Sequence, residues 1–535
     1  MAAEKKQSFL GGAAILAFGI VVVKVIGAVF KIPLRNLLGE AGSADFSNAY
    51  NIYATFLTIS TAGLPVALSK MVSESYALGR ARQAQRVFRV SLCVFLTLGA
   101  VSFLLMWWGN DYLAGLLNNP RAAYGIRALA PAVVCVGCLS AFRGYAQGRM
   151  NMAPTAISQI IEALCKLFLG LALAVLLLRA GQPDYIAAAG AITGVTVGTI
   201  VAVLYMAANY LHHRPTVDLR ERSDESGAIL RRLLSIAIPI TLSSSTVSII
   251  TLIDTSLVQG QLQNALGYTL DQTRQLYGNY AACMDLYNLP ASLMVALTSS
   301  VIPTVSGALA RRDRAQAAKL VSASFRVTAL LAFPMGFGLW ALSEPIMQLV
   351  YPNYDSALGG SLLGILGIAS IFVCLMLITN SILQSHGLVH IPIVTMLLGG
   401  VVKVVLNYNL VAIPEVNIHG APCGTLVCFV IAAVLNLACV SRMMKPRRIR
   451  YLSFFLKPLL SSLLMAVSAR AVFALLEKLL MVEGSRMMLL FCVAGSVCAA
   501  VVIYFALILA LHFITREDLA LLPKGEKLAA LLHIH

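Results

Sequence analysis

Charged residues are scarce in this sequence, and acidic residues are the scarcer kind. Only 12% of its 535 residues are Asp, Glu, Lys or Arg, which is about half of the share that is usual in soluble domains. Asp and Glu number 23, against 40 Lys and Arg. Because 59% of the residues are hydrophobic and long apolar runs recur from end to end, the composition excludes an ordinary soluble protein. It predicts an all-α polytopic membrane protein.

The sequence also lacks the short motifs of common catalytic sites. It contains no G-x-x-x-x-G-K-[ST] phosphate loop, no H-E-x-x-H zinc motif and no G-x-S-x-G nucleophile elbow. The eleven cysteines lie mostly in apolar segments, and Cys135 with Cys138 forms a lone C-x-x-C that has no second pair or histidine beside it. We therefore expect no cofactor and no metal centre of the zinc type, and a transporter in place of an enzyme. A membrane glycosyl- or acyltransferase is the enzyme alternative, because such enzymes can work with a few scattered acids and histidines.

Turn signals and charge clusters divide the apolar runs into fourteen predicted transmembrane helices. Their approximate bounds are 8–32, 47–69, 90–109, 122–143, 154–178, 185–210, 233–259, 279–306, 325–344, 357–384, 391–412, 418–441, 458–476 and 487–513. If the N-terminus is cytoplasmic, the inner segments hold 28 basic residues and the outer segments six. This asymmetry predicts that both termini are cytoplasmic, and it explains the net charge of +17 without a nucleic-acid partner.

Landmarks in the first half of the chain recur in the second half at a nearly constant offset. Lys166 recurs as Lys403, and the Tyr50-Asn51 pair recurs as Tyr287-Asn288, both displaced by 237 positions. Each copy holds six predicted helices, so both enter the membrane in the same direction and form a parallel repeat. The repeat predicts an N-terminal lobe over 1–210, a cytoplasmic linker over 211–232, a C-terminal lobe over 233–441, and two further helices with a tail over 442–535.

Three basic residues lie on one face of the first predicted helix. At 100° per residue, Lys24, Lys31 and Arg35 fall within about 40° of one another. A charge in the bilayer core is costly, so this cationic stripe should face a watery cavity or an anion. The alternative is that Lys31 and Arg35 extend to the outer headgroups, which is a weaker explanation for Lys24 because it lies deeper.

Two further groups of residues carry charge or coordinating oxygen at membrane depth. Glu162 precedes Lys166 by one helical turn, a spacing that favours a structural ion pair. Asp254 lies in the seventh predicted helix. Two explanations of Asp254 stay open: a partner for a basic residue, and a site that couples transport to a cation or a proton.

The N-terminal stretches KVIGAVFKIPLRNLLGEAG and AYNIYATFLTISTAGLPVALSKMVSE resemble the stage V sporulation protein B branch of the polysaccharide-exporter families. These families are grouped with the MurJ-type lipid II flippases and the MATE drug exporters in the MOP superfamily. In the second half, IDTSLVQG and YAACMDLYNLPASLMVALTSS are similar to the MurJ-type pattern. The resemblance implies a two-lobe transporter of the bacterial cytoplasmic membrane that flips an undecaprenyl-pyrophosphate-linked saccharide by alternating access.

The resemblance also implies site residues and partners. Lys24 matches a basic position of the first MurJ-type helix, and Asp254, Asn407 and Thr425 match a sodium site among helices 7, 11 and 12. The expected partners are membrane lipids and a polyprenyl-linked anionic saccharide, with sodium or proton coupling and a monomeric protein. Lipid II is the expected substrate. The alternatives are a cation-coupled MATE-type multidrug antiporter and a scaffold for cell-wall enzymes.

Overall fold

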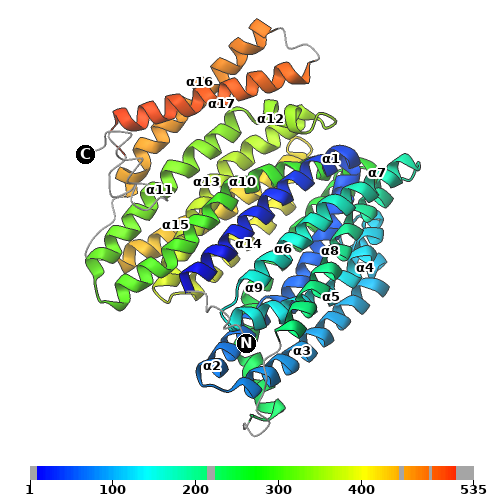
Figure 1. Cartoon of the computed structure of the whole chain (residues 1–535). Coiled ribbons are helices and arrows are strands. Elements are labelled where there is room, and N and C mark those ends of the chain that lie inside the picture. Colours follow the sequence, from blue (N-terminus) through cyan, green and yellow to red (C-terminus); the bar gives the residue numbers. More distant parts are fainter. Residues whose placement is uncertain (1–8, 214–222, 445–450, 481–484, 512, 514–535) are drawn as a thin grey trace. The chain divides into compact units, whose positions relative to one another are not determined.

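The computed structural model describes residues 9–213, 223–444, 451–480, 485–511 and 513. Throughout these residues the regular structure is helical, and no strand occurs among them (Figure 1). The chain divides into two compact units, Met1–Gly278 and Asn279–His535. The boundary falls inside one long helix, α10 (Leu270–Ala310). The centre of the predicted linker, at 214–222, lies outside the described residues.

In its described part, the first unit contains nine α-helices, two short helical turns and the first part of α10. Their bounds are α1 Phe9–Thr61, α2 Leu64–Ala77, α3 Ala81–Trp108, α4 Asn110–Leu116, η1 Pro120–Ala122, α5 Ala123–Gly148, α6 Ala153–Cys165, the π-helical turn η2 Lys166–Gly170, α7 Leu171–Arg179, α8 Asp184–His212 and α9 Ser226–Asn264.

The second unit continues from α10 through further helices. Their bounds are α11 Arg314–Ala341, α12 Ser343–Val350, α13 Ser356–Ser385, α14 His390–Leu410, η3 Asn417–His419, α15 Gly420–Met443, α16 Tyr451–Leu480 and α17 Arg486–Ala510. Within this unit α13 packs against α11 and α15, and α14 packs against α15. The last two helices, α16 and α17, pack on each other, and α16 also packs on α11 (Figure 1).

The structure confirms the prediction of an all-α polytopic membrane protein. Among the described residues, eleven helices are long and apolar enough to cross a membrane, and each coincides with one of the fourteen predicted helices. The other three predicted helices lie in α1, which contains most of the first two, and in α10, and the end of the second falls in α2. The predicted loop between the first two helices is itself helical, because α1 runs through it with a single kink.

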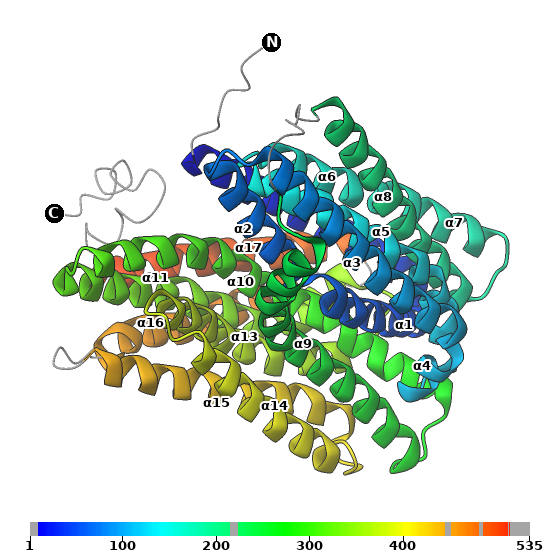
Figure 2. The ribbon, with the colours of Figure 1, turned by 90° about the horizontal axis from the view of Figure 1, so that it is seen from below.

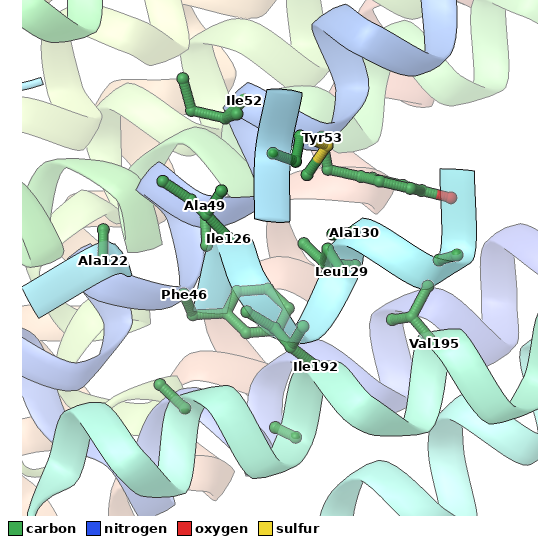
Figure 3. Close-up of a cluster of buried hydrophobic side chains, with 14 of the residues drawn as sticks. Phe46, Ala49, Ile52, Tyr53, Ala122, Ile126, Leu129, Ala130, Ile192 and Val195 are labelled. Carbon is green, nitrogen blue, oxygen red and sulfur yellow. The ribbon is translucent and has the colours of Figure 1, made fainter. Parts of the chain in front are cut away.

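The core of the first unit depends on small residues that let helices approach closely. Helix α5 lies between α3 and α8 (Figures 1 and 2). Figure 3 shows Phe46, Ala49 and Ile52 of α1 in the same cluster as Ile126 and Ala130 of α5 and Ile192 of α8. Small side chains at such contacts favour dispersion between closely packed helices, which is the main force between helices in lipid.

Helix α9 packs within the first unit although the repeat places it in the second half of the chain. It contacts α1, α2 and α3. The contact with α2 depends on Gly63, which directly precedes α2. A methyl group at this position would collide with the Ala237 carbonyl of α9. The Gly63 amide also donates a hydrogen bond to Thr241 Oγ1 of α9 at 3.2 Å. The predicted lobes are defined by the sequence repeat, whereas the two units are defined by packing contacts. The lobe boundaries therefore stay a prediction.

The kink of α1 lies at Gly39, whose φ of 66° and ψ of −173° are open to glycine and strongly unfavourable for other residues. We expect Gly39→Ala to lower the free energy of unfolding by about 1 to 3 kcal/mol, measured by thermal unfolding in detergent. An added methyl at Gly39 meets no atom within 4 Å, so the loss would be conformational. Gly27→Ala is the matched control, because its methyl is equally free of contacts and its backbone is helical. Equal stabilities of the two variants would contradict this explanation.

Candidate functional site

The cationic stripe lies on the part of α1 that precedes the kink, and its residues become more buried along the chain. Lys24 is exposed, Lys31 is partly exposed, and Arg35 is buried, with 5% of its surface accessible. The exposed Val21 and Val25 flank Lys24 on the same side of the helix. Lys24 is therefore the stripe residue that is most accessible to a ligand in this conformation.

Arg35 is engaged with the other arm of α1. Its Nη2 donates a hydrogen bond to Ser47 Oγ at 3.3 Å, across the kink at Gly39. This contact fastens the two arms of the helix to each other. The assignment of Lys24, Lys31 and Arg35 to a substrate site stays a prediction. The helical projection does not reveal that Arg35 is buried and links the two arms of α1.

A second charged group joins α5 and α6. Arg143 Nη2 lies 3.1 Å from Glu162 Oε2, and Arg143 Nε donates to Ser158 Oγ at 2.9 Å. Sequence spacing could not reveal this pair, because Arg143 and Glu162 belong to different helices. Arg143 is the last residue of the predicted span 122–143.

Lys166 lies one turn after Glu162, at the first position of the π-helical turn η2. Its Nζ lies 4.9 Å from the ring centroids of both Phe30 and Tyr50 of α1. This distance is typical of cation–π interactions. The ion pair of Glu162 with Lys166 stays a prediction, whereas the contact of Glu162 with Arg143 is observed.

The three predicted coupling residues are buried, one in the first unit and two in the second. Asp254 lies on α9 in the first unit and is 6% exposed, and Asn407 and Thr425 are buried on α14 and α15 in the second unit. Asn407 lies against Gly424, where a methyl group would overlap its amide oxygen, and Thr425 Oγ1 lies 3.4 Å from Tyr280 Oη. The structure thus brings Asn407 next to the residue before Thr425. The part of Asp254 in the same site stays a prediction.

A buried charge cluster in the first unit was not predicted from the sequence. Arg274 of α10 is 1% exposed and binds Asp45 of α1 through Nε at 3.0 Å and through Nη2. The same guanidinium binds Asp184 at 2.8 Å and Asp271 at 2.8 Å. Asp45 also accepts a hydrogen bond from Asn119 at 2.8 Å. Asp45 and Asp184 lie far from Arg274 in the chain, so no local motif signals these two contacts, whereas Asp271 lies only three residues before Arg274.

The outer edge of this cluster is solvated. Asp271 is 60% exposed and also pairs with Arg121 at 2.7 Å. Hydrogen bonding to Arg274, together with the positive charge of Arg121, holds the pKa of the Asp271 carboxyl below its usual range despite an opposing effect of desolvation. The cluster therefore grades from an exposed ion pair to a fully buried one, and it fixes the first turns of α10 to α1 and α8.

Polar side chains also join α1 to α9 within the first unit. Asn48 and Gln259 exchange two amide hydrogen bonds of 2.9 and 3.1 Å in a buried position. One helical turn further along α1, Asn51 donates to Thr255 at 3.2 Å, and Tyr277 donates to the same hydroxyl at 3.0 Å. Buried amides that satisfy each other hold a pair of helices in one register.

The comparisons with known proteins agree with this architecture. The family model described as "Polysaccharide biosynthesis protein" matches residues 9–309, which is more than half of the chain. The chain belongs to this polysaccharide biosynthesis family. A second model, MatE, matches residues 278–409. The prediction of membership in the MOP superfamily, which includes the MurJ and MATE proteins, is thereby confirmed.

Relatives of this family member cover most of its length. It is 24% identical to stage V sporulation protein B of Bacillus subtilis (strain 168) over 97% of its own chain and 98% of the relative, and 24% identical to the lipid II flippase MurJ of the same organism over 82% and 83%. A solved structure of lipid II flippase MurJ in an inward closed conformation superposes with a TM-score of 0.66 at 13% identity, covering 94% of this chain and 98% of that one. This last similarity shows the fold.

Proposed function

We propose that this protein is a flippase that moves a polyprenyl-pyrophosphate-linked saccharide from the inner to the outer leaflet of the cytoplasmic membrane, with lipid II as the first substrate to test. The observation that carries the proposal is Lys24, an exposed ammonium within a predicted membrane span of α1. Pyrophosphate is a strong acceptor for such a donor, and binding it offsets the cost of a cation at membrane depth. Both termini are cytoplasmic in this proposal, and the protein acts as a monomer.

The charge balance of the neighbouring helices supports an anionic substrate. The predicted spans 8–32, 122–143 and 154–178 lie in α1, α5 and α6–α7, which pack in one unit. Together they contain four basic residues at membrane depth, Lys24, Lys31, Arg127 and Lys166, with Arg143 at the cytoplasmic end of one span, and one acid, Glu162. An exporter of organic cations would need carboxylates in this part of the chain.

Rescue of a flippase-depleted bacterium tests the proposal. The protein is expressed in cells depleted of their own lipid II flippase, and outer-leaflet lipid II is measured by its accessibility to a membrane-impermeant reagent. We expect the wild-type protein to restore exposure, and reporters fused to each terminus to be active on the cytoplasmic side. Normal expression without any rescue would rule out lipid II and direct the search to other polyprenyl saccharides.

A cation-coupled antiporter of the MATE type is the second candidate, and the MatE match over residues 278–409 is the observation that favours it. Overexpression should then confer resistance to cationic drugs, which the flippase proposal does not expect.

The coupling ion enters the proposal through Asp254. We expect Asp254→Asn to abolish stimulation of transport by a sodium or proton gradient, a loss of about fivefold or more, because coupling between two ligands is typically worth 1 to 3 kcal/mol. Stimulation is measured as the ratio of transport with and without the gradient. Asp313→Asn is the matched control, because Asp313 is exposed and caps α11, where Asn caps about equally well. Unchanged stimulation in Asp254→Asn would exclude Asp254 as the coupling residue.

A further inference from the structure

The membrane-spanning segment Ala153–Arg179 is interrupted by a π-helical turn, η2, which begins at Lys166. Single π-helical turns are rare and often occur at functional sites. This turn is held firmly against α8, because a side chain at Gly170 would collide with the Ala191 carbonyl. The position of Lys166 is therefore fixed by the local backbone and its packing.

Two aromatic rings of α1 hold the ammonium group of Lys166. Its Nζ lies 4.9 Å from the centroids of the Phe30 and Tyr50 rings, on the two sides of the kink at Gly39. Phe30 directly precedes Lys31 in the sequence. The ammonium of Lys166 thus lies against α1, at the helical turn that contains Lys31.

The charged residues of α5, α6 and η2 that lie near Lys166 are mostly basic. The carboxylate of Glu162 is shared with Arg143 at 3.1 Å, so Arg143, Glu162 and Lys166 together carry a net charge of +1. Lys31 adds a further positive charge on α1. An excess positive charge within membrane-spanning segments is costly, and an anionic ligand lowers that cost. Lys166 is partly exposed, so a ligand can reach its side chain.

We propose that Lys166 is a further binding residue for the pyrophosphate of the transported lipid, acting from η2 beside α1. This inference rests on the proposed function, since it names a residue of the same substrate site. The aromatic rings keep the ammonium in place between transport events, and the phosphoryl oxygens accept its hydrogen bonds when the headgroup is bound. This role differs from the one that the sequence predicts, in which Lys166 only forms a structural ion pair with Glu162 and does not contact the substrate.

Binding of undecaprenyl pyrophosphate to the purified full-length protein in nanodiscs tests the inference, with undecaprenol as the uncharged probe. Lys166→Met removes the charge but keeps an apolar side chain that packs well on aromatic rings. Because a hydrogen bond to a charged group contributes about 1.5 to 3 kcal/mol, we expect this variant to bind undecaprenyl pyrophosphate about tenfold or more weakly. Its binding of undecaprenol and its melting temperature should not change. Lys166→Arg should keep most of the affinity, and Lys70→Met, at an exposed position on α2, should bind like the wild type.

The outcomes separate the inference from the proposed function. If the wild-type protein does not bind undecaprenyl pyrophosphate more tightly than undecaprenol, the proposed substrate class is wrong, and the inference is overturned with it. If the wild type discriminates and Lys166→Met binds equally well, only the inference is overturned. A parallel loss of both probes with a lower melting temperature in Lys166→Met and Lys166→Arg would make Lys166 a structural residue, which also overturns the inference.

Discussion

Replacing Arg274 by methionine is expected to destabilise the protein by about 3 to 5 kcal/mol, because removal of one partner leaves a buried charge without compensation. Arg274 binds three carboxylates, and Asp45, the most buried of them, is 2% exposed. Without Arg274, Asp45 would keep the hydrogen bond from Asn119, but this neutral donor would not balance the charge of the buried carboxylate. Thermal unfolding in detergent measures the loss.

Arg121→Met is the matched control for Arg274→Met. Both substitutions remove a guanidinium from the same cluster, but the pair of Arg121 with Asp271 is largely exposed, and such pairs contribute roughly 0 to 1 kcal/mol. The double variant Asp45→Leu with Arg274→Met should recover part of the stability, because no carboxylate of Asp45 remains to be compensated. Equal melting temperatures for Arg274→Met and Arg121→Met would contradict a buried cluster.

Replacing Lys24 by alanine is expected to reduce rescue of lipid II exposure by about 10- to 100-fold at matched expression. The estimate follows from the 1.5 to 3 kcal/mol that a hydrogen bond to a charged group contributes. Lys24 is exposed on α1, so its removal should leave folding unchanged. Rescue is read as the rate at which outer-leaflet lipid II becomes accessible.

Arg470→Ala serves as the control for the loss of a membrane-depth cation. Arg470 is also exposed, and it lies in a predicted span of the second unit, on α16, outside the proposed site. We expect Arg470→Ala to rescue like the wild type. If both variants lose rescue to the same degree, the effect belongs to membrane insertion, and Lys24 has no specific part in substrate binding.

The segments that form membrane-length helices could be predicted because long apolar runs are a strong local signal. The course of α1 could not be predicted in the same way. A proline inside a helix commonly kinks it, but the non-helical backbone angles of α1 occur at Gly39 and not at Pro33, and the chain between the two predicted spans is helical. Nothing in the local composition distinguishes Gly39 from the other glycines of this segment, because its conformation depends on how the second arm packs.

Residues of the candidate site were predictable where their signal was local and less so where it was not. The stripe of Lys24, Lys31 and Arg35 follows from helical periodicity within one segment. The Arg143–Glu162 pair and the contacts of Arg274 with Asp45 and Asp184 join residues 19 to 229 positions apart, and only the packed structure brings them together. A single sequence contains no information on such pairing beyond the presence of the charges.

The most direct measurement of the central claim is transport by the purified protein in proteoliposomes. A fluorescent polyprenyl-pyrophosphate saccharide is placed in both leaflets, and the fraction that a membrane-impermeant quencher reaches is followed over time. The account predicts that the wild-type protein makes the inner-leaflet pool accessible and that Lys24→Ala does so about 10- to 100-fold more slowly. A wild-type rate equal to that of protein-free liposomes under imposed sodium and proton gradients would contradict the flippase function.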